Sequence, residues 1–183
     1  MNIYTRKGDE GETGLLYGGR VWKDDAGPEA YGAVDEAVSA LGVARATASE
    51  PLSGHILSLE RDLFVVGAEL ATAPDNRSKL EPGVSLTTPA MVDRLEKLID
   101  DVVEEHPLPQ EFVVPGENQL EAALEVARAT VRRAERRAIT YLRSGGLEGS
   151  VVPMYLNRLA DVLYVLARST APTWEPTRPK EET

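Results

Sequence analysis

Apolar residues recur at alternating three- and four-residue steps in five stretches of the chain, which is the spacing of amphipathic helices. These stretches lie at residues 31–41, 56–70, 89–102, 120–138 and 156–166. Thr88 and Pro89 open the third as an N-cap residue followed by proline at the first helical position. Asn118 and Glu121 open the fourth at the spacing of a capping box. No apolar–polar alternation is longer than about four residues, so the pattern predicts an all-α, five-helix bundle.

The segments outside these stretches differ in character. Loops are expected at 74–87 and 107–117, and the proline-rich, charged tail at 172–183 is expected to be poorly ordered. No break in composition divides the chain, which predicts a single domain over residues 1–183.

Residues 1–27 form a glycine-rich segment that does not suit a helix. They hold six of the 15 glycines, interleaved with Arg6, Lys7, Arg20 and Lys23. The segment is not a Walker A loop, because no GK[ST] follows its glycines. Glycine-rich backbone can still present N–H groups to phosphate oxygens, and the basic side chains add positive charge. We therefore expect an N-terminal loop folded around an anion.

Charge and composition narrow the possible partners. The formal net charge of −10 disfavours general binding to nucleic acids or anionic membranes. No run approaches the roughly 18 to 20 apolar residues of a membrane span. The N-terminus has no apolar signal region, and its acidic residues argue against a transit peptide. The sequence contains no cysteine, which excludes disulfides, thiolate metal sites and cysteine nucleophiles. A cytoplasmic protein without nucleic-acid or membrane partners is expected.

A local basic cluster opposes this acidic background. Six arginines fall between residues 128 and 143, and Arg128, Arg132 and Arg136 recur every four residues along one helix face. A solvated face held by ion pairs is one interpretation. However, Glu135 alone cannot neutralise so many arginines, and arginine binds phosphate and carboxylate bidentately. The cluster therefore indicates an external anion or an acidic neighbouring element.

The fifth helical stretch carries a polar stripe on an otherwise apolar helix. Its members are Asn157, Asp161, Tyr164 and Arg168. The stripe is either the exposed side of the helix or part of a site, and the pattern alone does not decide between them.

Six blocks carry a resemblance to a known family. In order, they are "YTRKGDEGETGLL", "GGRVWKDD", "EAYGAVDE", "FVVPG", "ARATVRRAERR" and "LNRLADVLYVLAR". Together they resemble the PduO-type ATP:cob(I)alamin adenosyltransferases over residues 3 to about 168.

The resemblance implies a five-helix bundle, a homotrimer with active sites between subunits, and transfer of the 5′-deoxyadenosyl group of ATP to the cobalt of reduced cobalamin. The products are adenosylcobalamin and triphosphate. A corrinoid reductase and an adenosylcobalamin-dependent enzyme are the partners that it suggests. The alternative is a helical oligomer that holds cobalamin or ATP without catalysis. A ferritin-like di-metal centre is excluded, because neither His55 nor His106 has a glutamate three residues before it.

The resemblance also implies site residues. A first set wraps the triphosphate: Thr5, Arg6, Lys7, Gly8, Thr13, Gly14 and Lys23. A second set contacts the nucleotide from the last two helices: Arg132, Arg133, Glu135, Arg136 and Asn157. Asp35 and Arg128 match a charge pair that joins subunits beside the corrin, and Phe112 matches an aromatic against the corrin's lower face.

Magnesium is expected to be held mainly by phosphate oxygens and water, with Glu135 as the nearest candidate protein ligand. The alternative for Glu135 is to orient the neighbouring arginines. We expect Phe112 to act as an apolar wedge that displaces the lower axial ligand of cobalt. The alternative for Phe112 is a core residue that anchors its loop.

Some positions depart from the family pattern. Gly14 stands where many relatives carry a hydroxyl residue, Trp22 replaces a smaller residue, and Glu117-Asn118 replaces Gly-Ser or Gly-Thr. No phenylalanine follows Arg168 to serve as a second aromatic facing the corrin, and Trp174 is the one tryptophan in that part of the chain.

Overall fold

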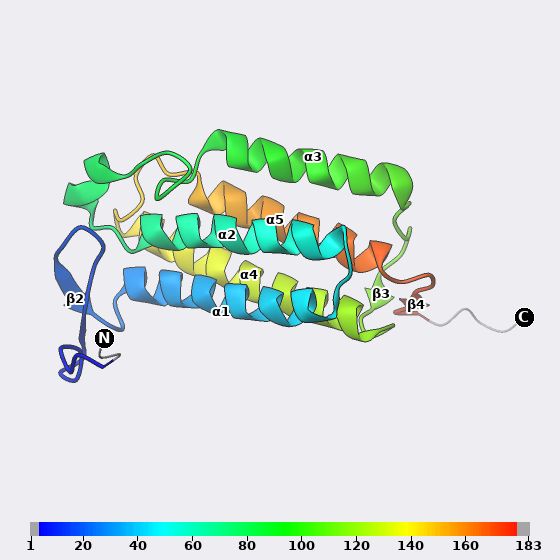
Figure 1. Cartoon of the computed structure of the whole chain (residues 1–183), viewed down its shortest axis with the longest axis horizontal. Helices are drawn as coiled ribbons and strands as arrows, with labels where there is room; N and C mark the ends of the chain where they lie inside the picture. Colours follow the sequence, from blue (N-terminus) through cyan, green and yellow to red (C-terminus); the bar gives the residue numbers. More distant parts are fainter. Residues whose placement is uncertain (1–3, 179–183) are drawn as a thin grey trace, which may run out of the picture.

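The computed structural model describes residues 4–178, and five α-helices run along its long axis (Figure 1). They are α1 (Ala26–Thr47), α2 (Leu52–Leu70), α3 (Pro89–Glu105), α4 (Gln119–Arg143) and α5 (Val152–Ser169). The predicted all-α, five-helix fold is therefore confirmed. Among the described residues, no helix combines the length and the hydropathy that a bilayer crossing requires.

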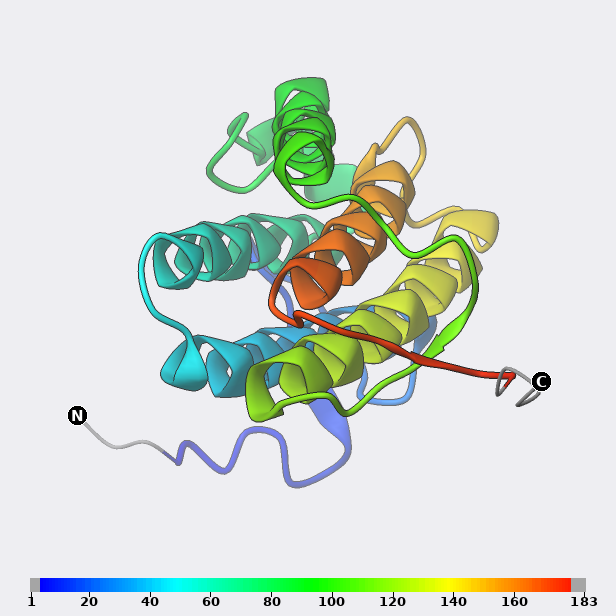
Figure 2. The ribbon, with the colours of Figure 1, turned by 90° about the vertical axis from the view of Figure 1, so that its right-hand side faces the viewer.

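Four of the helices surround the core, and α3 lies outside them. Viewed along the bundle, α1, α2, α5 and α4 enclose the interior, while α3 packs on the outer side against α5 (Figure 2). The apolar positions that predicted the helices fill this interior, and the central ones are fully buried: Leu41, Leu63, Leu124, Leu156 and Leu163. The periodicity thus arises from one buried stripe on each helix.

α1 and α4 meet along a seam of small side chains. Ala33 and Ala37 of α1 and Ala134 and Ala138 of α4 are all buried there. Alanine lets two helix axes approach closely, because the distance between axes depends on the side chains at the contact. The seam therefore brings the charged residues that flank it on both helices within reach of one another.

The caps that the sequence predicts lie where they were expected. α3 begins at Pro89 after Thr88, and α4 begins after Asn118, whose Oδ1 accepts a hydrogen bond from the backbone N–H of Glu121 at 2.9 Å. Glu121 does not return the bond as a capping box requires. Its Oε2 accepts from the backbone N–H of Gly116 at 2.7 Å instead.

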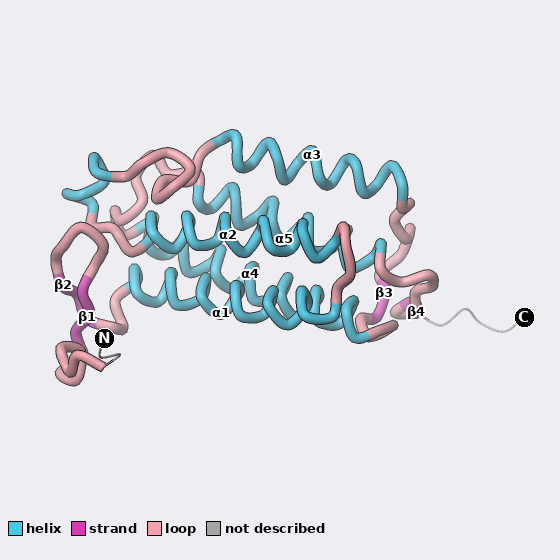
Figure 3. Tube along the Cα trace, in the orientation of Figure 1, coloured by secondary structure: helices cyan, strands magenta, loops and turns pink. Residues whose placement is uncertain are grey.

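The glycine-rich N-terminal segment contains an antiparallel hairpin of β1 (Glu12–Gly14) and β2 (Arg20–Trp22), drawn in magenta in Figure 3. Gly18 and Gly19 adopt φ values of 100° and 98°, which a residue with a Cβ rarely adopts. Leu16 fastens the hairpin to the bundle by donating its N–H to the carbonyl of Ala71 at 2.9 Å. Strands of three residues are too short to show an alternation, so the sequence did not predict them.

The loop expected at 74–87 contains a 3₁₀ helix, η1 (Pro74–Lys79). The loop expected at 107–117 contains β3 (Val113–Val114), which pairs antiparallel with β4 (Glu175–Pro176). Thr177 also donates its N–H to the carbonyl of Phe112 at 2.9 Å.

Within the tail at 172–183, which was expected to be poorly ordered, backbone pairing with this loop holds residues 175–177. Residues 179–183 lie outside the described residues.

Candidate functional site

The four arginines of α4 at positions 132, 133, 136 and 137 divide into two groups by their partners. Arg133 forms an ion pair with Glu36 of α1, and Arg137 Nε lies 3.4 Å from Glu29 Oε2 of the same helix. An acidic neighbouring element was one of the two alternatives that the sequence indicated, and α1, brought close by the alanine seam, is such an element. It accounts for only part of the cluster.

Arg132 and Arg136 form the other group. Both are exposed, and within residues 4–178 neither has a carboxylate oxygen within the 4.0 Å of an ion pair. Arg136 Nη1 donates to the carbonyl of Arg132 at 3.0 Å, which holds its guanidinium over the preceding turn of α4. Two adjacent arginines without carboxylate partners in the described chain are suited to bind an anion.

Glu135 and Asn157 are brought together between α4 and α5. Asn157 Nδ2 donates to Glu135 Oε1 at 3.2 Å, and both side chains are half-buried. Arg158, next along α5, is held by Glu96 of α3 at 2.8 Å. This surface therefore presents two arginines, one carboxylate and one amide side by side.

Arg128 and Asp35 are separate within the chain. Arg128 Nε forms an ion pair with Glu125 Oε2 of its own helix at 2.7 Å. Asp35 is exposed at an apolar groove of about 490 Å³ between α1 and α2. The groove is lined chiefly by Leu16, Tyr31, Val34, Val38, Leu63 and Phe64. Among the described residues no ion pair joins Asp35 to Arg128.

The leader, which we define as residues 4–25, keeps its basic groups at the end of the bundle. Thr5, Arg6 and Lys7 are exposed, and the Nζ of Lys23 donates to the carbonyl of Gly8 at 2.6 Å. The side-chain hydroxyl of Thr5 accepts from the N–H of Lys7 at 3.5 Å.

Thr13 and Gly14 belong to β1. No atom lies within 4 Å of where a Cβ on Gly14 would stand, so a hydroxyl residue would fit at this position. Within the described part of the chain, the leader's hydrogen bonds outside itself go to Glu29 of α1, Ala71, Asn76 and Ser85, not to α4. One chain alone therefore does not unite the two predicted halves of the site.

Phe112 lies at the opposite end of the bundle, on the loop before α4. Its side chain is 86% exposed, so it is not a core residue that anchors the loop. It borders a shallow hollow of about 210 Å³ together with Pro109, Gln110, Glu111 and Tyr164. An exposed aromatic ring on a loop that the backbone holds is available to press against a ligand.

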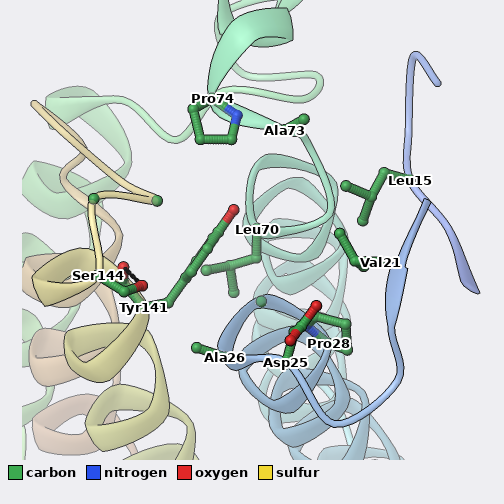
Figure 4. Close-up of a pocket in the computed structure, with 13 residues that line it drawn as sticks. Leu15, Val21, Asp25, Ala26, Pro28, Leu70, Ala73, Pro74, Tyr141 and Ser144 are labelled. Carbon is green, nitrogen blue, oxygen red and sulfur yellow. Dashed lines mark hydrogen bonds between the residues drawn. The ribbon is translucent and has the colours of Figure 1, made fainter. Parts of the chain in front are cut away.

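A further cavity, of about 410 Å³, lies where the leader meets the bundle (Figure 4). Leu15 and Val21 of the leader face Tyr141 across it, and burial raises the pKa of the Tyr141 phenol. None of the residues predicted to bind the nucleotide lines this cavity.

The family model described as cobalamin adenosyltransferase matches residues 3–170. The chain belongs to this family. It is 42% identical over 168 residues to a corrinoid adenosyltransferase of Citrobacter freundii, covering 91% of this chain and 93% of the relative. It is 37% identical to the Bacillus subtilis corrinoid adenosyltransferase, covering 92% and 86%.

A solved structure shares the fold. It is a single-residue variant of the PduO-type ATP:corrinoid adenosyltransferase from Lactobacillus reuteri, complexed with cobalamin and ATP. The TM-score is 0.86 at 29% identity, covering 97% of this chain and all of the other. The predicted family and the prediction of a corrinoid adenosyltransferase are thus confirmed, and catalysis is favoured over the non-catalytic alternative.

This adenosyltransferase has a buried ion cluster that the residue pattern did not predict. Arg168, assigned to a polar stripe whose exposure was left open, is only 2% exposed and contacts Glu121 and Glu125 of α4. The available clue was the placement of two glutamates at i and i+4 flanking the apolar Leu124. Asp161 of the same stripe is exposed, so the stripe divides between solvent and interior.

The two histidines lie near helix ends. His55 lies in the first turn of α2, and His106 is the C-cap of α3. Within residues 4–178, no three histidine, aspartate or glutamate side chains are grouped as a metal site. Glu135 remains a single carboxylate beside two exposed arginines. This fits Mg²⁺, which takes one or two protein carboxylates and completes its shell with phosphate oxygens and water.

Proposed function

We propose that this adenosyltransferase binds the triphosphate of ATP with Arg132 and Arg136 while reduced cobalamin attacks the ribose carbon. The observation that carries the proposal is the contrast within α4: Arg133 and Arg137 are paired with α1, whereas Arg132 and Arg136 are exposed without carboxylate partners in the described chain. A planar guanidinium can bind phosphate oxygens in a bidentate manner.

The reaction explains which residues are needed. The cobalt(I) electron pair forms a bond to C5′ of ATP, the C5′–O bond breaks, and triphosphate leaves with both bonding electrons. Cobalt(I) needs no general base, so a site of arginines, an amide and one carboxylate suffices. The principal demand is to stabilise the charge that develops on the leaving group, and preorganised cations meet it.

Glu135 and Asn157 orient the nucleotide in this proposal. The 3.2 Å hydrogen bond fixes both side chains between α4 and α5 beside the two arginines. Glu135 would supply the one protein oxygen to Mg²⁺, which when bound neutralises charge on the triphosphate. Arg133 has a smaller part, because Glu36 already neutralises it.

The leader completes the site from a neighbouring subunit of a homotrimer. Thr5, Arg6, Lys7, Gly8, Thr13, Gly14 and Lys23 would wrap the triphosphate there. Within the described part of one chain the leader makes no hydrogen bond to α4, which supports this arrangement, as does the exposure of Arg6 and Lys7. Asp35 of one subunit would pair with Arg128 of another for the same reason.

The corrin side is formed by Arg128, Asp35 and Phe112. Phe112 would act as the apolar wedge at the lower face of cobalt, and its exposure leaves it free to do so. A corrinoid reductase and an enzyme that uses adenosylcobalamin are the proposed partners.

The test is adenosylation with ATP, Mg²⁺ and chemically reduced cobalamin, followed by the absorbance of the cobalt–carbon product. Arg132→Ala is expected to lower kcat/KM by about 100- to 1000-fold, the range for losing one preorganised donor to a developing charge. Arg137→Ala is the matched control, because it removes a partly exposed arginine from the same helix. Equal activity in the two variants would contradict the phosphate assignment, and circular dichroism verifies that both fold.

A further inference from the structure

A buried ion cluster lies between α4 and α5, outside the proposed nucleotide site. Arg168 of α5 is 2% exposed, and its two carboxylate partners on α4, Glu121 and Glu125, are 0% and 8% exposed. Arg168 Nη2 donates to Glu125 Oε1 at 2.7 Å and also to Glu121 Oε1. One guanidinium nitrogen therefore binds two successive turns of α4.

One arm of the cluster reaches Arg128. The second oxygen of Glu125 accepts from Arg128 Nε at 2.7 Å, and Arg128 is partly exposed at the surface. Glu125 thus lies between a buried guanidinium and a surface guanidinium and binds each with a different oxygen. Because Arg168 fixes the carboxylate, it also fixes the direction in which the Arg128 side chain leaves α4.

The other arm reaches the loop that carries Phe112. Glu121 Oε2 accepts from the backbone N–H of Gly116 at 2.7 Å, four residues after Phe112. Asn118 adds a second tie, since its Nδ2 donates to the carbonyl of Thr170, two residues after Arg168. The end of this loop is therefore fastened both to Arg168 and to the end of α5.

Arg168 also contacts the hollow that Phe112 borders. Its guanidinium lies over the Tyr164 ring, 5.5 Å from the ring centroid, and Tyr164 lines that hollow. Arg168 is therefore connected to Arg128 through Glu125, to the Phe112 loop through Glu121, and directly to the ring of Tyr164.

The cluster is not explained by helix packing alone. Nε and Nη1 of Arg168 are buried without a hydrogen-bond partner in the described structure, which carries a desolvation cost. Apolar residues of similar volume often stabilise such a position as well as a buried ion pair does. A role in holding other groups would account for retaining the charges.

We propose that Arg168 is a positioning residue which, through Glu125 and Glu121, holds Arg128 and the Phe112 loop in a fixed relation on the corrin side of the site. This inference rests on the proposed roles of Arg128 and Phe112. It predicts that loosening the cluster impairs the use of cobalamin and leaves the binding of ATP intact.

The test compares Glu125→Gln and Arg168→Lys with the wild type in the full-length protein. Both are expected to lower kcat/KM for cobalamin by about 100-fold, as a displacement near 1 Å can do, while KM for ATP stays within about twofold. In addition, the EPR spectrum of bound cob(II)alamin with ATP is expected to show a smaller fraction lacking the lower axial nitrogen, because Phe112 is displaced.

Asp62→Asn is the matched control for the loss of a carboxylate between helices. Asp62 of α2 accepts from Arg94 of α3 at 2.9 Å and from the hydroxyl of Tyr155 of α5 at 3.2 Å. This variant is expected to lower the melting temperature without changing cobalamin kinetics or the EPR spectrum. If Arg168→Lys does not fold, Glu125→Gln alone decides, because it keeps the guanidinium and the shape of the side chain.

Two failures can be told apart. If Phe112→Ala and Arg128→Ala leave cobalamin kinetics unchanged, the proposed roles of these residues are wrong. If those two variants are impaired but Glu125→Gln and Arg168→Lys behave like Asp62→Asn, only the positioning role is overturned.

Discussion

The side-chain amide of Asn157 donates a hydrogen bond to Glu135 across 3.2 Å, joining α5 to α4 beside the exposed arginines. An anionic side chain at position 157 is therefore unfavourable, because it would stand next to the carboxylate of Glu135 and next to the proposed triphosphate site.

Asn157→Asp is therefore expected to raise KM for ATP by at least about tenfold, equivalent to about 1.4 kcal/mol of lost binding. Two carboxylates at hydrogen-bond distance raise the pKa of one of them, so the defect should shrink as the pH falls and that group takes up a proton. Steady-state kinetics between pH 5.5 and 8 would test this. Asn157→Ser, which adds no charge, is the control and should show no such pH dependence.

Phe112→Ala tests the wedge at the corrin's lower face. Adenosylation that starts from cob(II)alamin with a mild reductant is expected to fall by at least about 100-fold, because the lower axial ligand stays on cobalt. Adenosylation of cob(I)alamin made with a strong reductant should fall much less, since the electron has already been added. An equal loss in both assays would assign Phe112 to binding rather than to reduction.

Gly146 lies close against the ring of Tyr141. A Cβ at Gly146 would stand 2.0 Å from the Tyr141 ring, so Gly146→Ala forces the ring to move and is expected to cost about 1–3 kcal/mol of stability. Urea unfolding measures this cost. In a Tyr141→Ala background the same substitution should cost much less, because the ring is gone, and additive effects would contradict the contact.

The buried phenol of Tyr155 is expected to make the free energy of unfolding fall at high pH. Burial chiefly, and the neighbouring Asp62 in addition, raise the pKa of its phenol well above the ordinary value of 10.0. The folded state therefore keeps a proton that the unfolded chain releases above that value, so stability is full below pH 10 and falls as the pH rises further. Urea unfolding from pH 8 to 11 should show this fall, and Tyr155→Phe should lessen it. Tyr155→Phe should also cost about 1 kcal/mol at neutral pH through the lost hydrogen bond to Asp62.

The helices were predictable because their information is local. Each apolar stripe, the Thr88–Pro89 start and the Asn118 cap can be recognised within a few residues of sequence, and all three features lie where expected. The hairpin was not predictable, because Glu12–Gly14 and Arg20–Trp22 are too short to show a period.

The partners of the charged residues depend on tertiary packing, which the sequence pattern does not contain. Arg132 and Arg133 are adjacent, yet only Arg133 faces the glutamates of α1 across the alanine seam. Arg168 and Asp161 share a stripe on α5, but Arg168 turns toward α4 and is buried. The residue pattern indicates which positions are charged, and only the fold shows which of them are paired, buried or exposed.

The pairing of β3 with β4 has a practical consequence for handling the protein. Thr177 donates to the carbonyl of Phe112, and β4 pairs with β3 of the same loop. A fusion partner or a surface linkage attached directly after residue 178 would therefore disturb the position of the Phe112 loop. An attachment at the other end would act on the leader. Immobilisation through an exposed residue of α3, such as Lys97, leaves both ends of the molecule unmodified.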